Sequence, residues 1–372
     1  MKMAENRAAW AVLKGHPLEV KAAPYPNLNP KEMIIRNHAV AINPIDWLLA
    51  QHGPMILPFL KFPVILGSDL AGEVVATGSE VNRFRVGDRV LAFALGVTKT
   101  SMDNRQGAFQ HYPVIREDMA SPIPDSMSYE DASVLPLGIS TAACALYQKE
   151  NLALQHPSSS VKPTGKVVLI WGGSSSVGSC AIQLATSSGY EVITTCSPKN
   201  FEYVKKLGAN QIFDYKSPTV VQDIIAAFGK RECAGALSIG GGATEKCLDV
   251  LAKCKGIKKL AMVSFAIQPN EIPSNAFGFI PLMFPLMKES LNLMWKRKIM
   301  GLETSFVSGS DESGNEVRRI MYNDFLPEAL KIGKIVSAPK PTIIGKGLEK
   351  VEDAFIAQRK GVSASKVVVS II

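Results

Sequence analysis

The chain has 372 residues, which is enough for two domains, since a domain commonly has about 100 to 200 residues. Hydrophobic residues make up 47% of it, charged residues 20%, and the mean hydropathy is +0.11, so the composition excludes a disordered chain and favours a globular one. The formal net charge is +8, but the lysines and arginines are scattered, which argues against binding to nucleic acid. A basic balance also suits an anionic ligand or an acidic protein partner.

The cysteines and the hydrophobic stretches indicate where the protein works. Its six cysteines form no CxxC pair, which favours reduced thiols in an intracellular compartment. The N-terminal residues MKMAENRAAW lack the apolar core of a signal peptide. Residues 277–294 are apolar but interrupted by prolines and charges, so no membrane-spanning helix is expected there. We therefore expect a cytoplasmic protein that does not enter a membrane.

The first part of the chain, to about residue 135, has the pattern of a β-rich domain. Short runs of Val and Ile alternate with turn residues, as in Glu32 to Arg36 and Ala71 to Gly78. The segment VNRFRVGDRV, from Val81 to Val90, predicts a hairpin with Gly87-Asp88 at the turn between two strands.

After Pro136 the pattern changes to strands that alternate with helices. Such alternation is typical of a parallel, doubly wound sheet. Residues 266–300 are irregular and apolar, a helix is expected from Leu326 to Gly333, and Lys366 to Ile372 are expected to form a strand that pairs back with the first domain. The predicted helices of the middle region are Ile139–Lys149, Val177–Ser188, Asn200–Leu207, Val220–Phe228 and Ala243–Leu251, and its predicted strands are Lys166–Trp171, Glu191–Cys196, Gln211–Asp214, Ala234–Ile239 and Lys259–Phe265.

A glycine-rich turn follows the first of these strands. Gly172 and Gly173 are adjacent, Gly178 closes the motif, and Ser174, Ser175, Ser176 and Val177 lie between them. Glycines let the backbone approach a pyrophosphate, and the N-terminus of the next helix favours an anion. The spacing departs from G-x-G-x-x-G, and a glycine turn can also serve packing alone. The order of strand, turn and helix predicts a dinucleotide site.

The end of the next strand bears on the choice of cofactor. Folds that bind NAD usually place an acid there for the ribose hydroxyls, whereas this chain continues TTCSPKN through Asn200. Ser197 and Asn200 can hydrogen-bond a 2′-phosphate and Lys199 can neutralise part of its charge, so NADPH/NADP+ is favoured over NADH. The same residues can also simply cap the helix that follows, and both roles can hold together.

With these residues in view, the chain resembles the medium-chain dehydrogenase/reductase superfamily over nearly its whole length. Within that superfamily it is similar to the quinone oxidoreductase branch, and most similar to the fungal trans-acting enoyl reductases that serve polyketide synthases, because of Thr195 to Asn200 and Phe213 to Tyr215. The motifs that carry the wider resemblance are Ala41 to Asp46, Leu66 to Gly72, Val86 to Val90, Gly107 to Phe109 and Leu137 to Ala142.

The resemblance implies an α/β fold of two domains. A GroES-like β-rich domain, residues 1–138 with 340–372, would accompany a Rossmann domain with a doubly wound parallel sheet, residues 139–339, with a cleft between the two. Zinc-dependent members carry Cys where this chain has Asn43 to Asp46, and Gly-His-Glu where it has Gly67-Ser68-Asp69. Because a catalytic zinc needs about three protein ligands, we expect no metal.

The resemblance also assigns roles to individual residues. Residues on the nicotinamide and ribose side would include Asp46, which can alternatively be a plain helix N-cap. Ile139, Ser140 and Thr141 would bind the substrate, since hydroxyls and nearby N–H groups can position its carbonyl. The expected cofactor residues are Pro44, Ile45, Asp46 and Trp47, the glycine turn from Gly172 to Val177, then Ser197, Lys199, Asn200, Tyr215, Ile239, Gly240, Val263, Ser264, Ser365 and Lys366.

The implied activity is reduction of an activated carbon–carbon double bond. Hydride would pass from NADPH to the β-carbon of an α,β-unsaturated carbonyl, and no side chain stands out as the proton donor. The expected substrate is a small or carrier-bound unsaturated acyl group of fungal polyketide-type secondary metabolism, with a polyketide synthase as a partner and the protein a monomer or a homodimer. Alternatives are a stand-alone quinone or enone reductase, and a non-catalytic NADPH-binding protein. Residues 266–300 would wall an acyl cleft, although Met and Phe clusters also form plain core or a dimer face.

Overall fold

The computed structural model describes residues 5–98, 102–158, 160–264, 296, 298–309 and 315–372. The chain divides into two compact units, the first made of residues 1–137 and 321–372 and the second of residues 138–320. The second unit was predicted to end at residue 339, whereas it ends at residue 320. Residues from 321 onward group with the first unit, where the hydroxyl of buried Tyr322 donates to the Pro136 carbonyl at 3.2 Å and Arg83 donates to the Tyr322 carbonyl at 2.8 Å.

The first unit is built on β-sheets, as the alternating pattern predicted. Its larger sheet has the order β15-β16-β3-β5-β6-β8, and β7 pairs with β3. The predicted C-terminal strand is confirmed, since β16 pairs antiparallel with β3 through Val368 and Ala41. The strands are β3 (Glu32–Ala41), β5 (Asp69–Thr77), β6 (Arg89–Phe93), β7 (Val114–Arg116), β8 (Ala120–Pro122), β15 (Lys340–Lys346) and β16 (Ser365–Ser370), and a second sheet contains β1 (Asn6–Ala11), β2 (Glu19–Ala23) and β4 (Val64–Ile65).

The predicted hairpin at Val81 to Val90 is only partly correct. Gly87 has a φ of +97° and the N–H of Asp88 donates to the Arg85 carbonyl at 3.1 Å, so the turn lies where expected. No strand precedes it within residues 81–86, because β5 ends at Thr77 and the connection to β6 is irregular. The apolar residues of this connection do not alternate long enough to form a strand.

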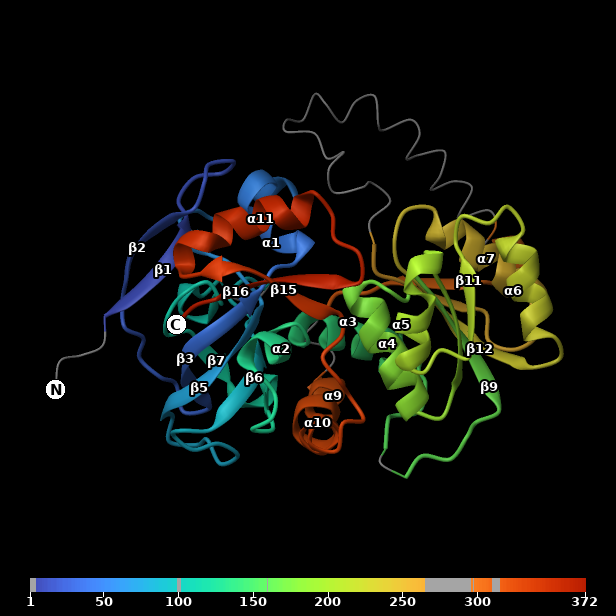
Figure 1. Cartoon of the computed structure of the whole chain (residues 1–372), viewed down its shortest axis with the longest axis horizontal. Helices are drawn as coiled ribbons and strands as arrows, with labels where there is room; N and C mark the ends of the chain where they lie inside the picture. The colour runs from blue at the N-terminus through green and yellow to red at the C-terminus, as the bar shows by residue number, and fades with distance from the viewer. Residues whose placement is uncertain (1–4, 99–101, 159, 265–295, 297, 310–314) are drawn as a thin grey trace. The chain divides into compact units, whose positions relative to one another are not determined.

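Short helices complete the first unit. Helix α1 (Pro44–His52) follows β3 directly, and α11 (Val351–Arg359) lies beside the sheet formed by β15 and β16, as Figure 1 shows. The remaining helical segments of this unit are η1 (Gly53–Met55), η2 (Asn104–Gln106), η3 (Glu117–Met119), α2 (Tyr129–Ser133), α10 (Leu326–Lys331) and η9 (Leu348–Lys350).

The second unit contains the predicted parallel sheet, with the order β11-β10-β9-β12-β13-β14. All of its strand pairs are parallel, and its central strand β9 (Lys166–Trp171) is buried from Val167 onward. A buried apolar run of this kind is typical of a sheet covered on both faces. The other strands are β10 (Glu191–Cys196), β11 (Gln211–Asp214), β12 (Glu232–Ser238), β13 (Lys259–Met262) and β14 (Glu303–Phe306).

Helices cover both faces of this sheet. Figure 1 shows α4 and α5 on one face and α6 and α7 on the other, so the doubly wound architecture is confirmed. Trp171, Ile224 and Leu248 belong to the core cluster under α6 and α7. The helices are α3 (Pro136–Tyr147), α4 (Ser176–Ser187), α5 (Phe201–Lys206), which η4 (Pro198–Asn200) precedes, α6 (Val220–Phe228) and α7 (Ala243–Lys253).

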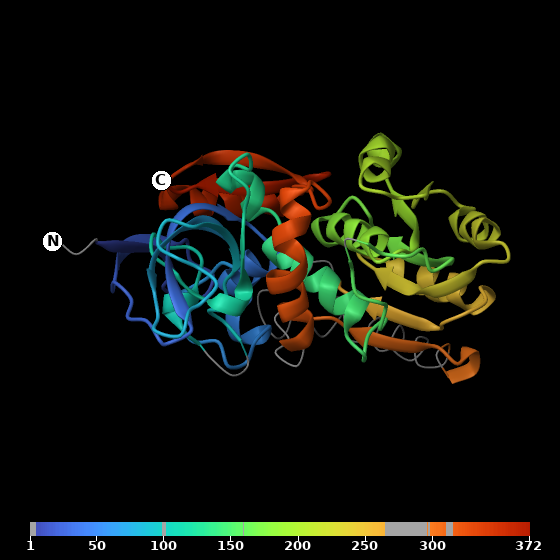
Figure 2. The same cartoon turned by 90° about the horizontal axis from the view of Figure 1, so that it is seen from below.

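A π-helical segment follows the second unit. Residues Arg319–Phe325 continue α9 (Asn315–Arg318) and lead into α10, and Figure 2 shows the three as one continuous helical rod. The apolar segment predicted to wall an acyl cleft falls largely outside the described residues, and Phe277, Phe279, Met283, Phe284 and Met287 are all outside them. Among the residues that are described, none forms a helix long and apolar enough to cross a membrane.

Candidate functional site

The glycine turn between β9 and α4 is too tight for side chains. Gly172 has a φ of +88°, and a Cβ there would lie 2.7 Å from the carbonyl oxygen of Ile239. A Cβ on Gly173 would lie 2.1 Å from Oγ1 of Thr194, and one on Gly178 would lie 2.3 Å from the carbonyl oxygen of Gly172. The backbone at this turn is therefore close to the neighbouring strands and bare of side chains at these three positions.

Hydrogen bonds hold this turn in place. The N–H of Gly172 donates to Oγ1 of Thr195 at 3.1 Å, and the N–H of Gly173 donates to the carbonyl of Thr195 at 2.9 Å. Ser175 is the N-cap of α4, and its hydroxyl accepts from the N–H of Gly178 at 3.1 Å. The first-turn amides of a helix lack partners within the helix, so the start of α4 presents positive N–H ends beside the turn.

The end of β10 has the polar residues that the sequence analysis singled out. Ser197 precedes the short helix η4, Lys199 is exposed within it, and Asn200 is 8% exposed. Asp214 pairs in register with Cys196, so Tyr215, which is 37% exposed, follows β11 beside Ser197. These residues lie at the same edge of the sheet as the glycine turn, because the carboxyl ends of parallel strands meet there.

The later strands bring the remaining predicted residues of the second unit to that edge. The N–H of Ile239 donates to the carbonyl of Trp171 at 3.2 Å, which joins the end of β12 to the end of β9. Ser264 accepts from the N–H of Gly240 at 2.8 Å, and the N–H of Val263 donates to the carbonyl of Ser238. The structure thus gathers the second-unit cofactor candidates along one edge of the parallel sheet.

The predicted substrate residues lie on α3. Ile139, Ser140 and Thr141 are all buried, with exposed fractions of 1%, 4% and 5%. A Cβ on Gly309 would lie 2.4 Å from Oγ1 of Thr141, so the chain after β14 passes directly against this hydroxyl. Asp69 accepts from the N–H of Leu137 at 2.6 Å, which places a carboxylate at the start of the helix, where a negative charge is favourable.

A cluster of four polar residues is buried in the first unit, and we call Asn43, Asp46, Asp69 and Lys366 the buried quartet. Their exposed fractions are 2%, 2%, 0% and 4%. The Lys366 ammonium lies 3.0 Å from Oδ2 of Asp69 and donates to Oδ1 of Asn43. The side-chain amide of Asn43 donates to Oδ2 of Asp69 at 2.9 Å. The quartet therefore joins β16, β5 and the start of α1 through charged and hydrogen-bonded side chains.

Asp46 completes the quartet as the third residue of α1. The N-cap is Asn43, not Asp46, and the N–H of Asn43 donates to Oδ2 of Asp46 at 2.7 Å. The alternative that Asp46 is itself the N-cap is therefore wrong, because α1 begins at Pro44. Burial raises the pKa of Asp46 to about 7, the nearby Asp69 adds to this increase, and the hydrogen bond from Asn43 and the charge of Lys366 oppose it.

The other predicted residues of the first unit are sequence neighbours of Asp46 and Lys366. Trp47 is 4% exposed, its indole N–H donates to Gln358, and the guanidinium of Arg359 lies 5.2 Å from its ring centroid. The Ser365 hydroxyl donates to the Lys340 carbonyl at 3.2 Å. Pro44 is exposed and Ile45 is half-buried.

Sequence reasoning assigned no role to several residues that shape these sites. Asn43 and Asp69 lie in two of the family motifs, Ala41 to Asp46 and Leu66 to Gly72. Their positions match zinc ligands in zinc-dependent members, and this match could have identified them as site residues. Thr194 and Thr195 contact the glycine turn from the adjacent strand. Only the register of β10 against β9 reveals these two contacts.

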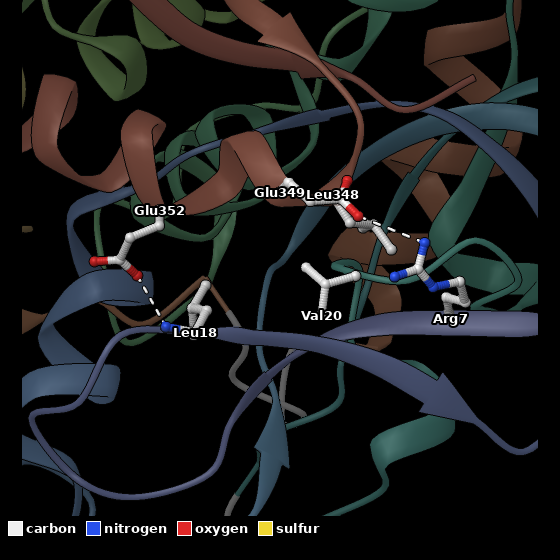
Figure 3. Close-up of a pocket in the computed structure, with 6 residues that line it drawn as sticks. All are labelled: Arg7, Leu18, Val20, Leu348, Glu349 and Glu352. Carbon is white, nitrogen blue, oxygen red and sulfur yellow. Dashed lines mark hydrogen bonds and ion pairs between the residues drawn. The ribbon is translucent and has the colours of Figure 1, made fainter.

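A pocket of about 400 Å³ lies elsewhere in the first unit, between β2 and the start of α11 (Figure 3). Arg7 pairs with Glu349 at 3.5 Å, and the N–H of Leu18 donates to Glu352 at 3.1 Å. Its carboxylates therefore already have partners, and it contains none of the predicted site residues. The lining residues are Arg7, Leu18, Val20, Leu348, Glu349 and Glu352.

Comparisons with known proteins agree with this architecture. Residues 29–125 match the alcohol dehydrogenase GroES-like domain, and residues 176–288 match the zinc-binding dehydrogenase family. Among the described residues, no group of His, Cys, Asp and Glu side chains is arranged to hold a metal ion.

Relatives align along nearly the whole chain. The dehydrogenase pigH of Monascus ruber is 47% identical over 99% of this chain and 100% of that protein. The trans-enoyl reductase himH of Aspergillus japonicus is 36% identical over 98% of this chain and 97% of that protein. The crystal structure of the CurK enoyl reductase has the same fold, with a TM-score of 0.74 and 20% identity over 99% of this chain and 100% of that one. The chain therefore belongs to the medium-chain dehydrogenase/reductase family of oxidoreductases, together with these fungal dehydrogenases and trans-enoyl reductases.

Proposed function

We propose that this protein is a zinc-independent enoyl reductase that uses NADPH to reduce a carbon–carbon double bond conjugated to a carbonyl. Members of its family bind nicotinamide cofactors, and a relative named trans-enoyl reductase is 36% identical to it. The choice of cofactor, the absence of zinc and the class of substrate are our inferences, and each depends on particular side chains.

The second unit fits a dinucleotide. Gly172, Gly173 and Gly178 let the turn pack tightly against Ile239, Thr194 and its own backbone, and a tight glycine turn between a strand and a helix is typical of a pyrophosphate site. The N-terminus of α4 beside this turn supplies N–H donors and a favourable dipole. These features support a pyrophosphate site at the carboxyl end of β9.

Residues after β10 support NADPH as the cofactor. The strand ends at Cys196, and no acid follows through Asn200, whereas an acid at this place usually binds the ribose hydroxyls of NAD. Exposed Lys199 and the side chains of Ser197 and Asn200 are suited to a 2′-phosphate, since charged hydrogen bonds to phosphate are the strong ones. We therefore infer a preference for the phosphorylated cofactor.

The observation that carries the choice of reaction is the buried quartet. Zinc-dependent members would use positions that match Asn43 and Ser68-Asp69 as ligands. Here Asn43 and Asp69 are hydrogen-bonded to each other, and the Lys366 ammonium lies 3.0 Å from Asp69. A zinc ion does not fit here, because the buried positive charge of Lys366 would repel it and the side chains of Asn43 and Asp69 are already hydrogen-bonded. A conjugated carbonyl already polarises its double bond, so enoyl reduction does not require that Lewis acid.

The residues of this chain would then bind and orient the reactants. When bound, NADPH supplies a hydride to the β-carbon, the double bond becomes an enolate, and a proton added at the α-carbon completes the reduction. The hydroxyls of Ser140 and Thr141 are the candidates for holding the carbonyl oxygen as it gains negative charge. Alignment of the reactants and donors to this oxygen would supply the rate enhancement.

The substrate that we propose is an unsaturated acyl thioester, carried by a synthase of fungal polyketide-type metabolism. Two relatives are named as trans-enoyl reductases of Aspergillus species, and that name supports a substrate presented by another protein. We further propose that the protein acts in the cytoplasm, free of nucleic acid, as a monomer or a homodimer.

A turnover assay tests this function directly. The purified protein, before and after dialysis against a chelator, is given NADPH or NADH with an unsaturated acyl thioester, a free enone or a quinone, and cofactor oxidation is followed by absorbance. We expect the protein to reduce the thioester with NADPH at the same rate before and after dialysis against the chelator. Elemental analysis should find less than one zinc atom per chain.

Contrary results would separate the parts of the proposal. Loss of activity on chelation with recovery on adding zinc would overturn zinc independence. Turnover of quinones or free enones without thioester reduction would favour a stand-alone reductase, and tight NADPH binding with no turnover of any substrate would favour a binding protein without catalysis.

A further inference from the structure

Lys246, in the first turn of α7, bridges the ends of two strands that are not neighbours. Its ammonium lies 5.4 Å from the ring centroid of Trp171, the last residue of β9. The same ammonium donates to the carbonyl oxygen of Tyr215, the first residue after β11, at 3.1 Å. Two separate contacts therefore place this charge at the carboxyl edge of the parallel sheet.

The sheet order shows what lies beside this ammonium. Strand β10 runs between β9 and β11, with Thr195 paired to Trp171 and Cys196 paired to Asp214. Neighbouring strands are about 4.8 Å apart, so a group that touches the ends of both outer strands lies next to the end of β10. That end continues into Ser197 and Lys199, where the 2′-phosphate is expected.

Among the residues that the structure describes, no carboxylate balances the charge of Lys246. No ion pair among the described residues includes Lys246, nor Lys199 or Lys216. Lys216 also lies near Tyr215, with its ammonium 5.7 Å from the centroid of that ring. The nearby acid Asp214 accepts a hydrogen bond from the backbone N–H of Lys216 instead.

Three other lysines of the same unit form ion pairs. Lys166 pairs with Glu232, Lys259 pairs with Glu303, and Lys296 pairs with Asp249 of α7 itself. Lys246 is instead held at the carboxyl edge by a carbonyl and an aromatic ring. An ammonium that is held in position and has no carboxylate partner within the described part of the chain is suited to an anion of about two charges.

We propose that Lys246 is a specificity residue that binds the 2′-phosphate of NADPH from the side opposite Lys199. This inference deepens the proposed function, since it assumes that a nicotinamide dinucleotide binds along this edge. Lys246 lies 47 residues beyond Lys199, after β11 and β12, and its contacts with Trp171 and Tyr215 bring it to this edge of the sheet.

The test is a calorimetric titration of the whole protein with four probes: NADPH, NADH, 2′,5′-ADP and 5′-AMP. The variants are Lys246→Met, which keeps an apolar stem, and Lys246→Arg, which keeps the charge. Lys253→Met is the matched control, because Lys253 is exposed on the last turn of the same helix. Thermal unfolding of each variant shows whether the fold is intact.

We expect Lys246→Met to weaken NADPH and 2′,5′-ADP binding about tenfold, the size of one lost charged hydrogen bond, with NADH and 5′-AMP changed less than twofold. Lys246→Arg should retain most of the preference, and Lys253→Met should change no affinity. An equal loss for all four probes would overturn the inference, since Lys246 would then contact adenine or support Trp171. An unchanged ratio in Lys246→Met would overturn it as well.

The same titration separates this inference from the proposed function. If the unaltered protein binds NADH as tightly as NADPH, the proposed cofactor is wrong and the inference fails with it. If the unaltered protein prefers NADPH and Lys246→Met keeps that preference, only the role of Lys246 is wrong.

Discussion

Lysines at two sites of the molecule, the buried quartet and the carboxyl edge of the parallel sheet, have opposite surroundings. In the first unit, Lys366 is 4% exposed and its charge is taken up by Asp69 and Asn43. In the second, Lys199 is exposed and Lys246 has a carbonyl and a ring for neighbours but no carboxylate among the described residues. In the buried quartet the lysine already has a charged partner within the protein. At the edge of the parallel sheet the lysines can instead pair with a bound anion.

This contrast suggests a division of labour. A buried ion pair contributes little net stability relative to a well-packed apolar core, but breaking it leaves an uncompensated charge, so it holds its elements in one arrangement. Exposed, unpaired lysines cost little when removed and act mainly on the affinity for anions. The first unit would therefore respond to mutation in stability, and the edge of the second in binding.

The largest effect is expected for Lys366→Met. This change leaves the Asp69 carboxylate, which is 0% exposed, without its positive partner, and removing one member of a buried pair costs about 3–5 kcal/mol. The free energy of unfolding from urea titration measures it. Lys253→Met and Lys350→Met serve as controls, since Lys253 is exposed and Lys350 forms an exposed pair with Asp353 at 2.9 Å, and neither should change stability measurably.

The contrast would fail if Lys366→Met were as stable as the controls. A double variant, Asp69→Asn with Lys366→Met, removes both charges and should recover part of the lost stability. If the double variant were no more stable than Lys366→Met, the loss would come from packing of the lysine stem and not from charge.

The next effect concerns pH and Asp46, whose pKa is raised by burial to about 7 from about 3.9 in an unfolded chain. Between about pH 4 and pH 7 the folded protein keeps a proton that the unfolded chain has lost, so stability falls as the pH rises through this window. Asp46→Asn should abolish this fall, which amounts to at most about 1.4 kcal/mol per pH unit. Urea titrations at several pH values measure the slope.

A substitution at the surface serves as the control for the pH dependence of stability. Asp125→Asn alters an exposed carboxyl of the same unit and should leave the pH dependence as it is in the unaltered protein. Identical slopes for Asp46→Asn and the unaltered protein would mean that Asp46 is ionised throughout this window.

A smaller effect is expected in the second unit for Gly173→Ala. The new Cβ would lie 2.1 Å from Oγ1 of Thr194 and 2.9 Å from Cδ1 of Ile182, and overpacking of this kind costs about 1–3 kcal/mol. Denaturant unfolding measures the stability, and calorimetry should show weaker NADPH binding. Adding Thr194→Ala removes the closest contact and should restore part of the stability and part of the NADPH affinity. If the double variant were equally impaired, the clash with Thr194 would not be the cause.

Much of the second unit could be predicted from local patterns. The strands Lys166–Trp171, Glu191–Cys196 and Gln211–Asp214 and the helix Val220–Phe228 have the predicted bounds, because buried strands and glycine turns leave strong local signals. The hairpin in the first unit was predicted only in part, since its turn at Gly87-Asp88 is where expected but β5 and β6 pair across a connection of 11 residues.

Side-chain contacts between distant residues were the part that sequence could not supply. Asp46 and Lys366 were both singled out, but Asn43 and Lys366 are 323 residues apart, and no spacing rule joins them. Lys246 was not singled out, because its place beside Tyr215 depends on the order of strands in the sheet. Patterns of hydrophobicity predict which face is buried, whereas such contacts follow from the register of the sheets.

The late position of β16 also sets an order of events while the protein is being made. Asn43 and Asp69 leave the ribosome early, whereas Lys366 follows Asn43 by 323 residues, a delay of roughly 15 to 65 s at ordinary rates of translation. The second unit has all of its described strands before that lysine is added. Until β16 is made, the edge of β3 that it pairs with is open and Asp69 lacks its positive partner. The first unit can therefore be completed only after the second unit has been synthesised.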